Sequence, residues 1–568
     1  MKTTPSIKTP AARSHGAIAT PERRKLVSQC FAALAACVFL PATPALAQLQ
    51  TVVEFTGTGG GSKGNSPEAV LASDGAGFLW GTTAEGGANG LGTMFKVNAG
   101  TGVLTPLLDF TGNGTSNKGR GPRAGMARDG AGFFWGTTQA GGANDLGTVF
   151  KVNAVTGTLA TLVEFTGNGA SNKGTGPRAA LASDEAGFFW STTVQGGAGN
   201  FGTVFKINAV TGALTTLVEF TGTGGGSKGS RPQEGLASDG AGFFWGTTSQ
   251  GGANDLGTVF KVNVVTGALT TLVEFTGNGP TNKGNNPSAR LVSDGAGSFW
   301  GTTQGGGASG CGTVFKVNAG TGALTTLVEF TGIGGSNKGN LSVAGLARDG
   351  AGFLWGTTSQ GGANGRGTVF KANQSSGALT TLAEFTGNSG NSKGTAPLAG
   401  LVRDGTGFFW GTTSGGGANG FGTVFKIAAF RPDMLVGLKT SALKGNGIYN
   451  TTGASQSQAV KVPVGGSVKV PMKIQNDAPV PDILIVRGTA GDGNFRVTYF
   501  RGTTNVTASV VAGTFNTGLL AAGASVTLKA EIKARTSVAG KRRTLGITAK
   551  SVGDSTATDR VNIKAKSD

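Results

Sequence analysis

A tryptophan recurs every 55 residues through most of the chain, and this period limits most strongly what the chain can fold into. An aspartate lies six residues before each tryptophan and a lysine seventeen before, with no insertion or deletion in any copy. A repeat of this length is one supersecondary unit, which buries its apolar surface on its neighbours. The series contains all seven tryptophans: Trp80, Trp135, Trp190, Trp245, Trp300, Trp355 and Trp410.

Each repeat is expected to form four strands. In the fourth copy these are residues 236–238, 243–248, 258–263 and 269–275, which are rich in β-branched and aromatic residues and bounded by Gly, Asn and Asp. Tight turns at 239–242 and 265–267 indicate antiparallel hairpins. The pattern therefore predicts an all-β, seven-bladed β-propeller over residues 48–430. A parallel β-solenoid would also explain the period, but it predicts parallel coils in place of hairpins.

The phase of the strands at the two ends of the repeat region favours a closed ring. Residues 49–55 match the fourth strand of the unit, whereas the seventh copy ends at its third strand, 423–428. The N-terminal strand is therefore expected to complete the last blade. An open solenoid does not require its first strand to pair with its last repeat.

Residues 431–568 have a different pattern, with alternating strands at 459–462, 467–474, 495–500 and 525–532. Seven or eight short strands without a helical period predict an immunoglobulin-like β-sandwich, not of the antibody type because it lacks Cys and Trp. This segment carries 19 basic and eight acidic residues, out of a net charge of +19 for the chain. Such a charge suggests contact with an anionic surface, or only solubility.

The N-terminus has the features of a signal peptide spanning residues 1–47. Three basic residues at 23–25 precede an apolar stretch at 30–40 and a small-residue cleavage site at 45–47. We expect an exported protein, extracellular, on the cell surface or periplasmic, with no transmembrane segment, since no later stretch is long and apolar enough. Two alternatives stay open: lipid attachment at Cys37, and twin-arginine export through Arg23 and Arg24.

Removal of the leader would leave one cysteine, Cys311, and no histidine. Ser-His-Asp and Cys-His catalysis, His-ligated zinc and Cys-rich metal sites are then excluded, because each needs an imidazole or several thiolates. We expect no metal, no cofactor and no disulfide within the chain. Cys311 replaces the Leu or Phe of most other copies, which suggests a small buried apolar residue.

The motif DGAGFFW, followed by GTT, GGAN and GTVFK at fixed spacing, resembles the GloVer-type tandem repeat of exported bacterial proteins. The resemblance covers residues 49–430 and implies export and surface display, and it supplies no established catalytic residue. The Asp-x-x-Gly-x-x-Trp turn is also similar to the sialidase Asp-box, but it is one residue longer and lacks the Thr, so sialidase chemistry is not carried over. Four residues depart from the repeat locally: Glu185 and Ser191 replace glycines, Ser298 replaces an aromatic residue, and Ser342 replaces the proline of the other copies.

Two repeated side chains are best explained structurally. The recurrent aspartate, Asp74 in the first copy, is expected to bond its own turn rather than to act as an acid or a Ca²⁺ ligand. The tryptophans are expected in the core between blades rather than stacked on sugars.

The two long loops of each repeat, which leave the same face of a propeller, carry the candidate ligand-binding residues. Ammonium and amide donors there would form a near-sevenfold ring suited to a polyanion or a polyhydroxylated polymer, unless they are only solvated loop tips. The set is Lys63, Lys118, Lys173, Lys228, Lys283, Lys338, Lys393, Asn89, Asn144, Asn254, Asn364 and Asn419.

Catalysis would require residues that break the symmetry of the ring, because an acid and a base must be placed differently. The unrepeated acids on the loops are Glu68, Glu85, Asp145, Glu234 and Asp255. We expect a monomeric, non-catalytic binding scaffold for extracellular glycan or another anionic surface polymer, with nucleic acid an unfavoured partner. The alternatives are a polysaccharide hydrolase or lyase that uses these carboxylates, and a purely structural envelope protein.

Overall fold

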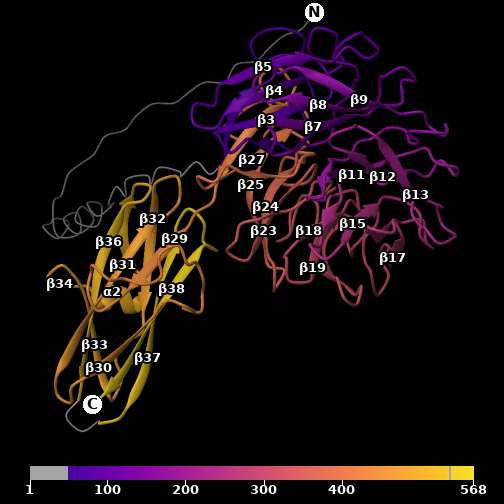
Figure 1. The fold of residues 1–568 in the computed structure, drawn as a ribbon. Coiled ribbons are helices and arrows are strands. Elements are labelled where there is room, and N and C mark those ends of the chain that lie inside the picture. The colour runs from indigo at the N-terminus through magenta and orange to yellow at the C-terminus, as the bar shows by residue number, and fades with distance from the viewer. Residues whose placement is uncertain (1–48, 536–538) are drawn as a thin grey trace, which may run out of the picture. The chain divides into compact units, whose positions relative to one another are not determined.

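The computed structural model describes residues 49–535 and 539–568. The expected signal peptide, and with it Cys37, lies outside the described residues. Almost all the described secondary structure is β, arranged as seven four-stranded sheets followed by two five-stranded sheets. The chain passes through the blades in sequence order, as the colour gradient of Figure 1 shows.

The first strand of each blade is its shortest and lies at the edge of its sheet. These strands are β2 (Ala72–Ser73), β6 (Ala127–Arg128), β10 (Ala182–Ser183), β14 (Ala237–Ser238), β18 (Val292–Ser293), β22 (Ala347–Arg348) and β26 (Val402–Arg403). The second strands contain the tryptophans: β3 (Phe78–Thr83), β7 (Phe133–Thr138), β11 (Phe188–Thr193), β15 (Phe243–Thr248), β19 (Ser298–Thr303), β23 (Phe353–Thr358) and β27 (Phe408–Thr413).

The third strands are almost fully buried. They are β4 (Thr93–Asn98), β8 (Thr148–Asn153), β12 (Thr203–Asn208), β16 (Thr258–Asn263), β20 (Thr313–Asn318), β24 (Thr368–Asn373) and β28 (Thr423–Ala428). The outer strands are β5 (Leu104–Asp109), β9 (Leu159–Glu164), β13 (Leu214–Glu219), β17 (Leu269–Glu274), β21 (Leu324–Glu329), β25 (Leu379–Glu384) and, from the N-terminus, β1 (Leu49–Glu54).

The strands agree closely with the sequence prediction. In the fourth blade all four lie within the predicted ranges. Gly240, Gly242 and Gly267 have φ of 70°, 96° and 70°, which is the left-handed conformation that the predicted turns require. All ladders within the seven blades are antiparallel, which rules out the solenoid alternative.

The predicted closure of the ring is present. β1 pairs antiparallel with β28, from Leu49 opposite Ile427 to Glu54 opposite Thr423. Trp410 of the last blade packs in one cluster with Leu79 and Phe95 of the first. Figure 1 shows β27 beside β3 and β4, although more than 300 residues separate them in the sequence.

Each interface between blades buries one tryptophan against the next sheet. Trp245 stacks on Phe299 with ring centroids 4.5 Å apart, and Trp80 stacks on Phe134 at 4.7 Å. Such pairs add about 0.5–1.5 kcal/mol to the free energy gained by burying their area. The tryptophans therefore form the core of the ring, as predicted.

The change of architecture falls between Ala428, the last residue of β28, and Pro432, the first of β29. One sheet has the order β29-β31-β36-β33-β34 and the other β30-β38-β37-β32-β35, with β30 and β38 parallel. Ten strands and the short helix α2 (Thr507–Ala512) exceed the seven or eight strands expected. The strands are β29 (Pro432–Val436), β30 (Ser457–Val462), β31 (Ser467–Asn476), β32 (Asp482–Gly488), β33 (Phe495–Arg501), β34 (Thr504–Asn505), β35 (Phe515–Leu520), β36 (Ser525–Ala534), β37 (Arg542–Ser551) and β38 (Thr558–Ser567).

Candidate functional site

The repeated aspartate has a structural role, as the sequence indicates. Asp239 Oδ1 accepts hydrogen bonds from the backbone amides of Ala241 (2.7 Å) and Phe243 (3.0 Å), and Oδ2 accepts one from Trp245 Nε1 (3.3 Å). The carboxylate thus fixes the turn and the tryptophan together.

The seven repeated lysines are not free loop tips. In the fourth blade Lys228 Nζ lies 2.9 Å from Glu274 Oε1, which ties the long loop at the start of the blade to the blade's outer strand. The corresponding distances in the other blades are 2.6–2.8 Å, with Asp109 replacing glutamate once and Glu54 of β1 serving the last blade. The lysine side chains are 26–34% exposed, so a ligand would have to share each ammonium with a carboxylate.

The repeated asparagines are also engaged. Asn254 Nδ2 donates to the backbone carbonyl of Phe275 at 3.0 Å, and Asn89, Asn144, Asn364 and Asn419 make the same contact at 2.9–3.1 Å. The two long loops do lie together, since Gly57 on one bonds Gly87 on the other. The predicted ring therefore exists mainly as a structural network, and ligand binding by its lysines and asparagines stays a prediction.

Three of the five unrepeated acids stabilise local structure. Glu85 accepts a hydrogen bond from Asn65 Nδ2 at 2.9 Å. Asp145 forms a bidentate pair with Arg120 (2.7 and 3.0 Å), and Asp255 accepts from the Gly251 amide at 2.7 Å. The other two, Glu68 and Glu234, line one cavity.

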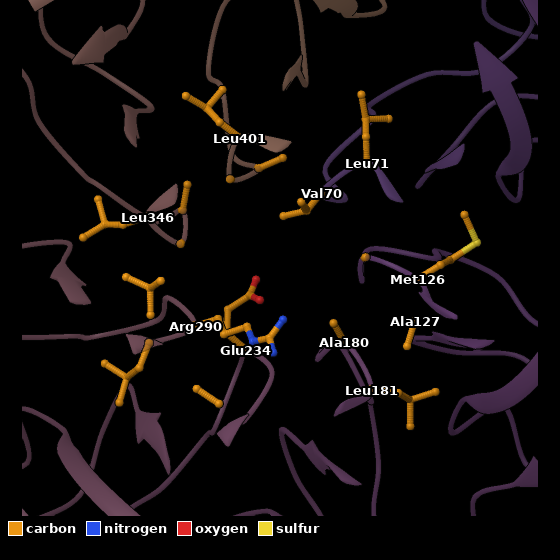
Figure 2. Close-up of a pocket in the computed structure, with 18 of the residues that line it drawn as sticks. Val70, Leu71, Met126, Ala127, Ala180, Leu181, Glu234, Arg290, Leu346 and Leu401 are labelled. Atoms are coloured by element: carbon orange, nitrogen blue, oxygen red, sulfur yellow. The ribbon is translucent and has the colours of Figure 1, made fainter. Parts of the chain in front are cut away.

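That cavity, of about 580 Å³, runs along the axis of the ring, between the segments that lead into the short first strands. At the position of Glu234 every other repeat has alanine, and at the position of Arg290 the others have Gly, Ala or Val. Figure 2 shows both side chains projecting into the middle of the opening. The fourth and fifth blades thus place one acid and one base where the rest of the ring is small and neutral.

Glu234 and Arg290 influence each other electrostatically. Burial raises the pKa of Glu234 to about 7, and the Gly235 amide and the charge of Arg290 only partly oppose this. Burial lowers the pKa of Arg290, against the attraction of Glu234. Arg290 Nε donates to the Leu236 carbonyl at 3.1 Å, and this contact fixes the direction of the guanidinium while its two terminal nitrogens stay available.

A second charged group comes from the first three blades. Arg123 Nη1 forms an ion pair with Glu68 Oε2. In the next repeat Arg178 occupies the equivalent position, where burial and the nearby charge of Arg123 lower its pKa. Within the described residues Arg178 has no hydrogen-bond acceptor for its guanidinium. The axial region therefore holds three arginines and two glutamates, one of which is easily protonated.

The remaining wall of the cavity is apolar. Leu346, Leu401 and Val70, from the sixth, seventh and first blades, surround the other side of the opening (Figure 2). A ligand in this cavity would have an anionic group toward Arg290 and a less polar part toward these side chains.

Three arginines of the axial region are absent from the residues predicted from the sequence. Arg123, Arg178 and Arg290 lie just before the short first strands and break the repeat there, as the unrepeated acids do, and this departure from the repeat is the sequence signal that indicates them.

Cys311 is half-buried and not fully buried, with Sγ 3.4 Å from the Ser309 carbonyl. This correction arises because its position lies at the loop surface, where the equivalent Phe201 is 38% exposed.

Two kinds of site are missing from the described part of the chain. No group of three or more His, Cys, Asp or Glu side chains there is arranged to hold a metal ion. In residues 49–535 and 539–568, no helix has the length and hydropathy needed to cross a membrane.

Comparison with solved structures gives distant similarities to β-rich proteins. A protein assigned as a 6-phosphogluconolactonase from Bacteroides uniformis is 15% identical, with a TM-score of 0.38 over 56% of this chain and 83% of its own. A counterpart from Bacteroides fragilis, also 15% identical with the same coverage, has a TM-score of 0.36. A eukaryotic initiation factor structure is 9% identical, with a TM-score of 0.28 over 64% of this chain and 82% of its own.

No curated protein matches the sequence. The family model described as the Gloeobacter/Verrucomicrobia repeat matches residues 37–230 and 225–393, which together make up more than half of the chain. This match agrees with the GloVer-type motifs and with the seven structural repeats. The chain is a tandem-repeat protein that belongs to the Gloeobacter/Verrucomicrobia repeat family.

Proposed function

We propose that this is an exported binding protein whose propeller takes an anionic residue of an extracellular glycan into its axial cavity. The observation that carries the proposal is the break in symmetry at Arg290. The other repeats have Gly, Ala or Val at this position, and among the described residues no carboxylate lies within ion-pair distance of Arg290, so its charge is left for a ligand. An anionic ligand would supply the missing partner.

The size and chemistry of the cavity support a ligand of one to a few sugar residues. A volume of about 580 Å³ lies within the usual range for small-molecule sites. The terminal nitrogens of Arg290 can bind a carboxylate in a bidentate manner. The apolar wall around Leu346 and Leu401 suits the less polar face of a sugar ring.

The loop lysines and asparagines are a weaker basis for the same function, because each already has a protein partner. Their contribution would be to hold the shape of the face that surrounds the cavity. We therefore propose the axial cavity, and not the predicted ring of loop donors, as the binding site.

A glycan array probed with the full chain at low salt tests the proposal. We expect retention on glycans that end in a uronic or sialic acid and not on their neutral counterparts. The double variant Glu234→Ala/Arg290→Gly, which restores the residues of the other repeats, should lose this retention while keeping the wild-type melting temperature. Equal retention on neutral and acidic glycans, or none on either, would refute the proposal.

A second candidate function is hydrolysis or elimination at the same site. Glu68 and Glu234 line one cavity, and a carboxyl group with a pKa of about 7 is suited to general acid catalysis. This candidate predicts slow release of reducing ends from acidic oligosaccharides, abolished by Glu234→Gln. Turnover that is unchanged in this variant would dismiss the enzymatic alternative.

A further inference from the structure

The outer face of one sandwich sheet carries a row of like charges in direct register. Lys461 on β30 lies opposite Lys566 on β38, and Lys566 lies opposite Arg542 on β37. Because adjacent strands are about 5 Å apart, three cations occupy a width of about 10 Å. All three side chains are exposed (strands labelled in Figure 1).

This row borders a shallow hollow of about 760 Å³ that is lined by basic, small and hydroxyl residues. Lys564 adds a fourth cation, one pleat along β38 from Lys566. Arg543 is neutralised by Asp492 at 2.5 Å, but the other four cations have no ion pair within the described residues. Asp568, whose backbone amide donates to the Val462 carbonyl at 3.0 Å, is not among the lining residues, and the four unpaired cations leave the hollow strongly positive.

Like charges placed directly opposite each other across strands destabilise a sheet. Here the sequence places two such pairs side by side, although Thr544 and Ala459 in the next register show that neutral residues fit the same strands. A bound polyanion would remove this repulsion and would gain free energy by releasing counter-ions.

We propose that this face of the sandwich binds an acidic polysaccharide along its length, as a second site independent of the propeller cavity. The hollow has no aromatic side chain on which nucleobases would stack. It has only Ala and Val as apolar lining, which is too little to insert into a membrane. These two features favour an acidic polysaccharide over a nucleic acid or a membrane as the partner.

The opposite sheet offers a matched control, because its outer face is also basic but has one directly opposed cation pair, Arg496 and Lys533, in place of a row of three. Lys469, Lys529, Lys533 and Arg496 are exposed there. They surround Glu531, which lies opposite Lys469 and beside the Ser467 hydroxyl at 2.9 Å. Reversing four cations on either face changes the net charge of the chain by the same amount.

The test measures binding of the full chain to immobilised dextran sulfate over a range of salt concentrations. The variant Lys461→Glu/Arg542→Glu/Lys564→Glu/Lys566→Glu should lose at least tenfold in affinity and show a shallower salt dependence. The milder set of four changes to Gln should lose at least threefold, with a melting temperature no lower than that of the wild type because the repulsion between the cations is removed. The control Lys469→Glu/Arg496→Glu/Lys529→Glu/Lys533→Glu should lose less than threefold.

Equal losses for the two faces would overturn the proposal, because net charge alone would then explain binding. Tighter binding to single-stranded DNA or to phosphatidylglycerol vesicles than to dextran sulfate at equal charge concentration would also overturn it. The variant Arg290→Gly should bind dextran sulfate like the wild type, so failure at the propeller cavity and failure at this face are separable.

Discussion

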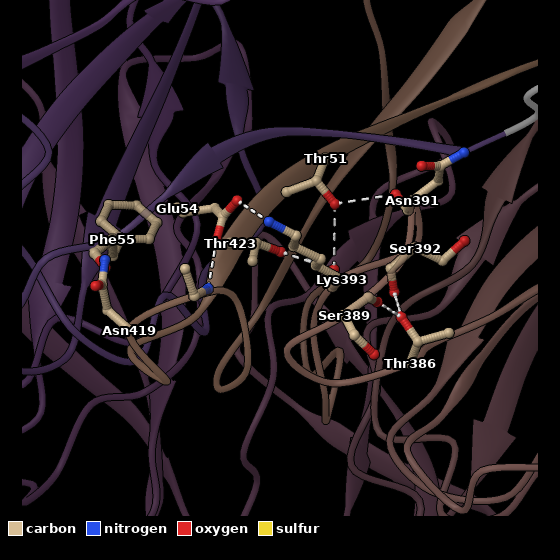
Figure 3. Close-up of polar contacts among 11 residues, drawn as sticks. Thr51, Glu54, Phe55, Thr386, Ser389, Asn391, Ser392, Lys393, Asn419 and Thr423 are labelled. Atoms are coloured by element: carbon tan, nitrogen blue, oxygen red, sulfur yellow. Dashed lines mark hydrogen bonds and ion pairs between the residues drawn. The ribbon is translucent and has the colours of Figure 1, made fainter.

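Lys393 Nζ lies 2.7 Å from Glu54 Oε1, and this ion pair joins residues 339 positions apart in the sequence. Figure 3 shows the pair at the seam of the ring, with the Glu54 carboxylate also accepting a hydrogen bond from the backbone amide of Ala418. Thr51 Oγ1 adds a contact to the Asn391 carbonyl at 3.3 Å. The same lysine–carboxylate pair recurs within every other blade, but only here does it hold the chain's first described strand.

Lys393→Met should loosen the N-terminal strand. Removing the partner of a half-buried carboxylate costs about 1 kcal/mol in the free energy of unfolding. We expect faster hydrogen exchange across β1 and faster proteolysis near residue 56. Lys228→Met, which breaks the same pair inside the fourth blade, should cost a similar free energy without exposing β1, and equal exchange of β1 in the two variants would contradict the assigned role.

Trp300 should tolerate substitution better than Trp245. Among the residues that the structure describes, Trp300 Nε1 has no hydrogen-bond partner, whereas Trp245 Nε1 donates to Asp239. Of the two, Trp245 alone stacks on a phenylalanine of the next blade. Tryptophan to phenylalanine at position 245 should therefore cost about 1 kcal/mol more than at position 300. Urea unfolding of the two variants measures the difference, and equal costs would show that the aspartate contact is energetically neutral.

The repeated glutamates of the propeller and two buried aspartates of the sandwich should affect stability oppositely as pH changes. The Lys118 hydrogen bond holds the pKa of Glu164 below its usual value, and Glu219 and Glu274 are lowered in the same way by their lysines. In the sandwich, burial raises the pKa of Asp559 to about 6, and burial raises that of Asp433 as well.

An acid whose pKa is lower in the folded than in the unfolded protein stabilises the fold at pH values above its unfolded-state pKa. This stabilisation is lost as the pH falls through the folded-state pKa. An acid with a raised pKa binds more protons when folded, so its contribution weakens as pH rises from about 4 through its folded pKa. Hydrogen exchange of the full chain should show β29 and β38 gaining stability between pH 8 and pH 5.5. Asp559→Asn should reduce this gain, and a gain of equal size in that variant would assign it to other groups.

Anion binding in the propeller cavity should strengthen as pH falls through about 7. Protonation of Glu234 removes the negative charge that competes for Arg290, so the positive field in the cavity grows. Titration calorimetry with digalacturonate from pH 8 to pH 5.5 should show this increase, and Glu234→Gln should bind as tightly at pH 8 as the wild type does at pH 5.5. A pH profile that is the same in both would remove Glu234 from the site.

The repetition explains why the fold was so readable from the sequence. Seven copies of one pattern average out the ambiguity of any single strand, and the unmatched strand at residues 49–55 predicted the pairing with β28. The candidate site was harder to predict because ion pairing of Lys228 with Glu274 depends on how far a loop folds back over its blade. Glu234 can be identified in the sequence as an unrepeated acid. Its proximity to Arg290, 56 residues later, cannot, because it depends on the ring bringing neighbouring blades together around one axis.

Calorimetric titration of digalacturonate into the wild-type chain and into the variants Arg290→Gly and Arg120→Ala measures whether the axial cavity binds an acidic sugar. Arg290→Gly removes the cation of the cavity, and Arg120→Ala removes an exposed loop arginine that pairs with Asp145. We expect Arg290→Gly to lower the affinity at least tenfold, because it loses a charge-assisted hydrogen bond of about 1.5–3 kcal/mol, and Arg120→Ala to leave the affinity unchanged. Equal affinity for all three proteins would contradict a binding site on the axis of the propeller.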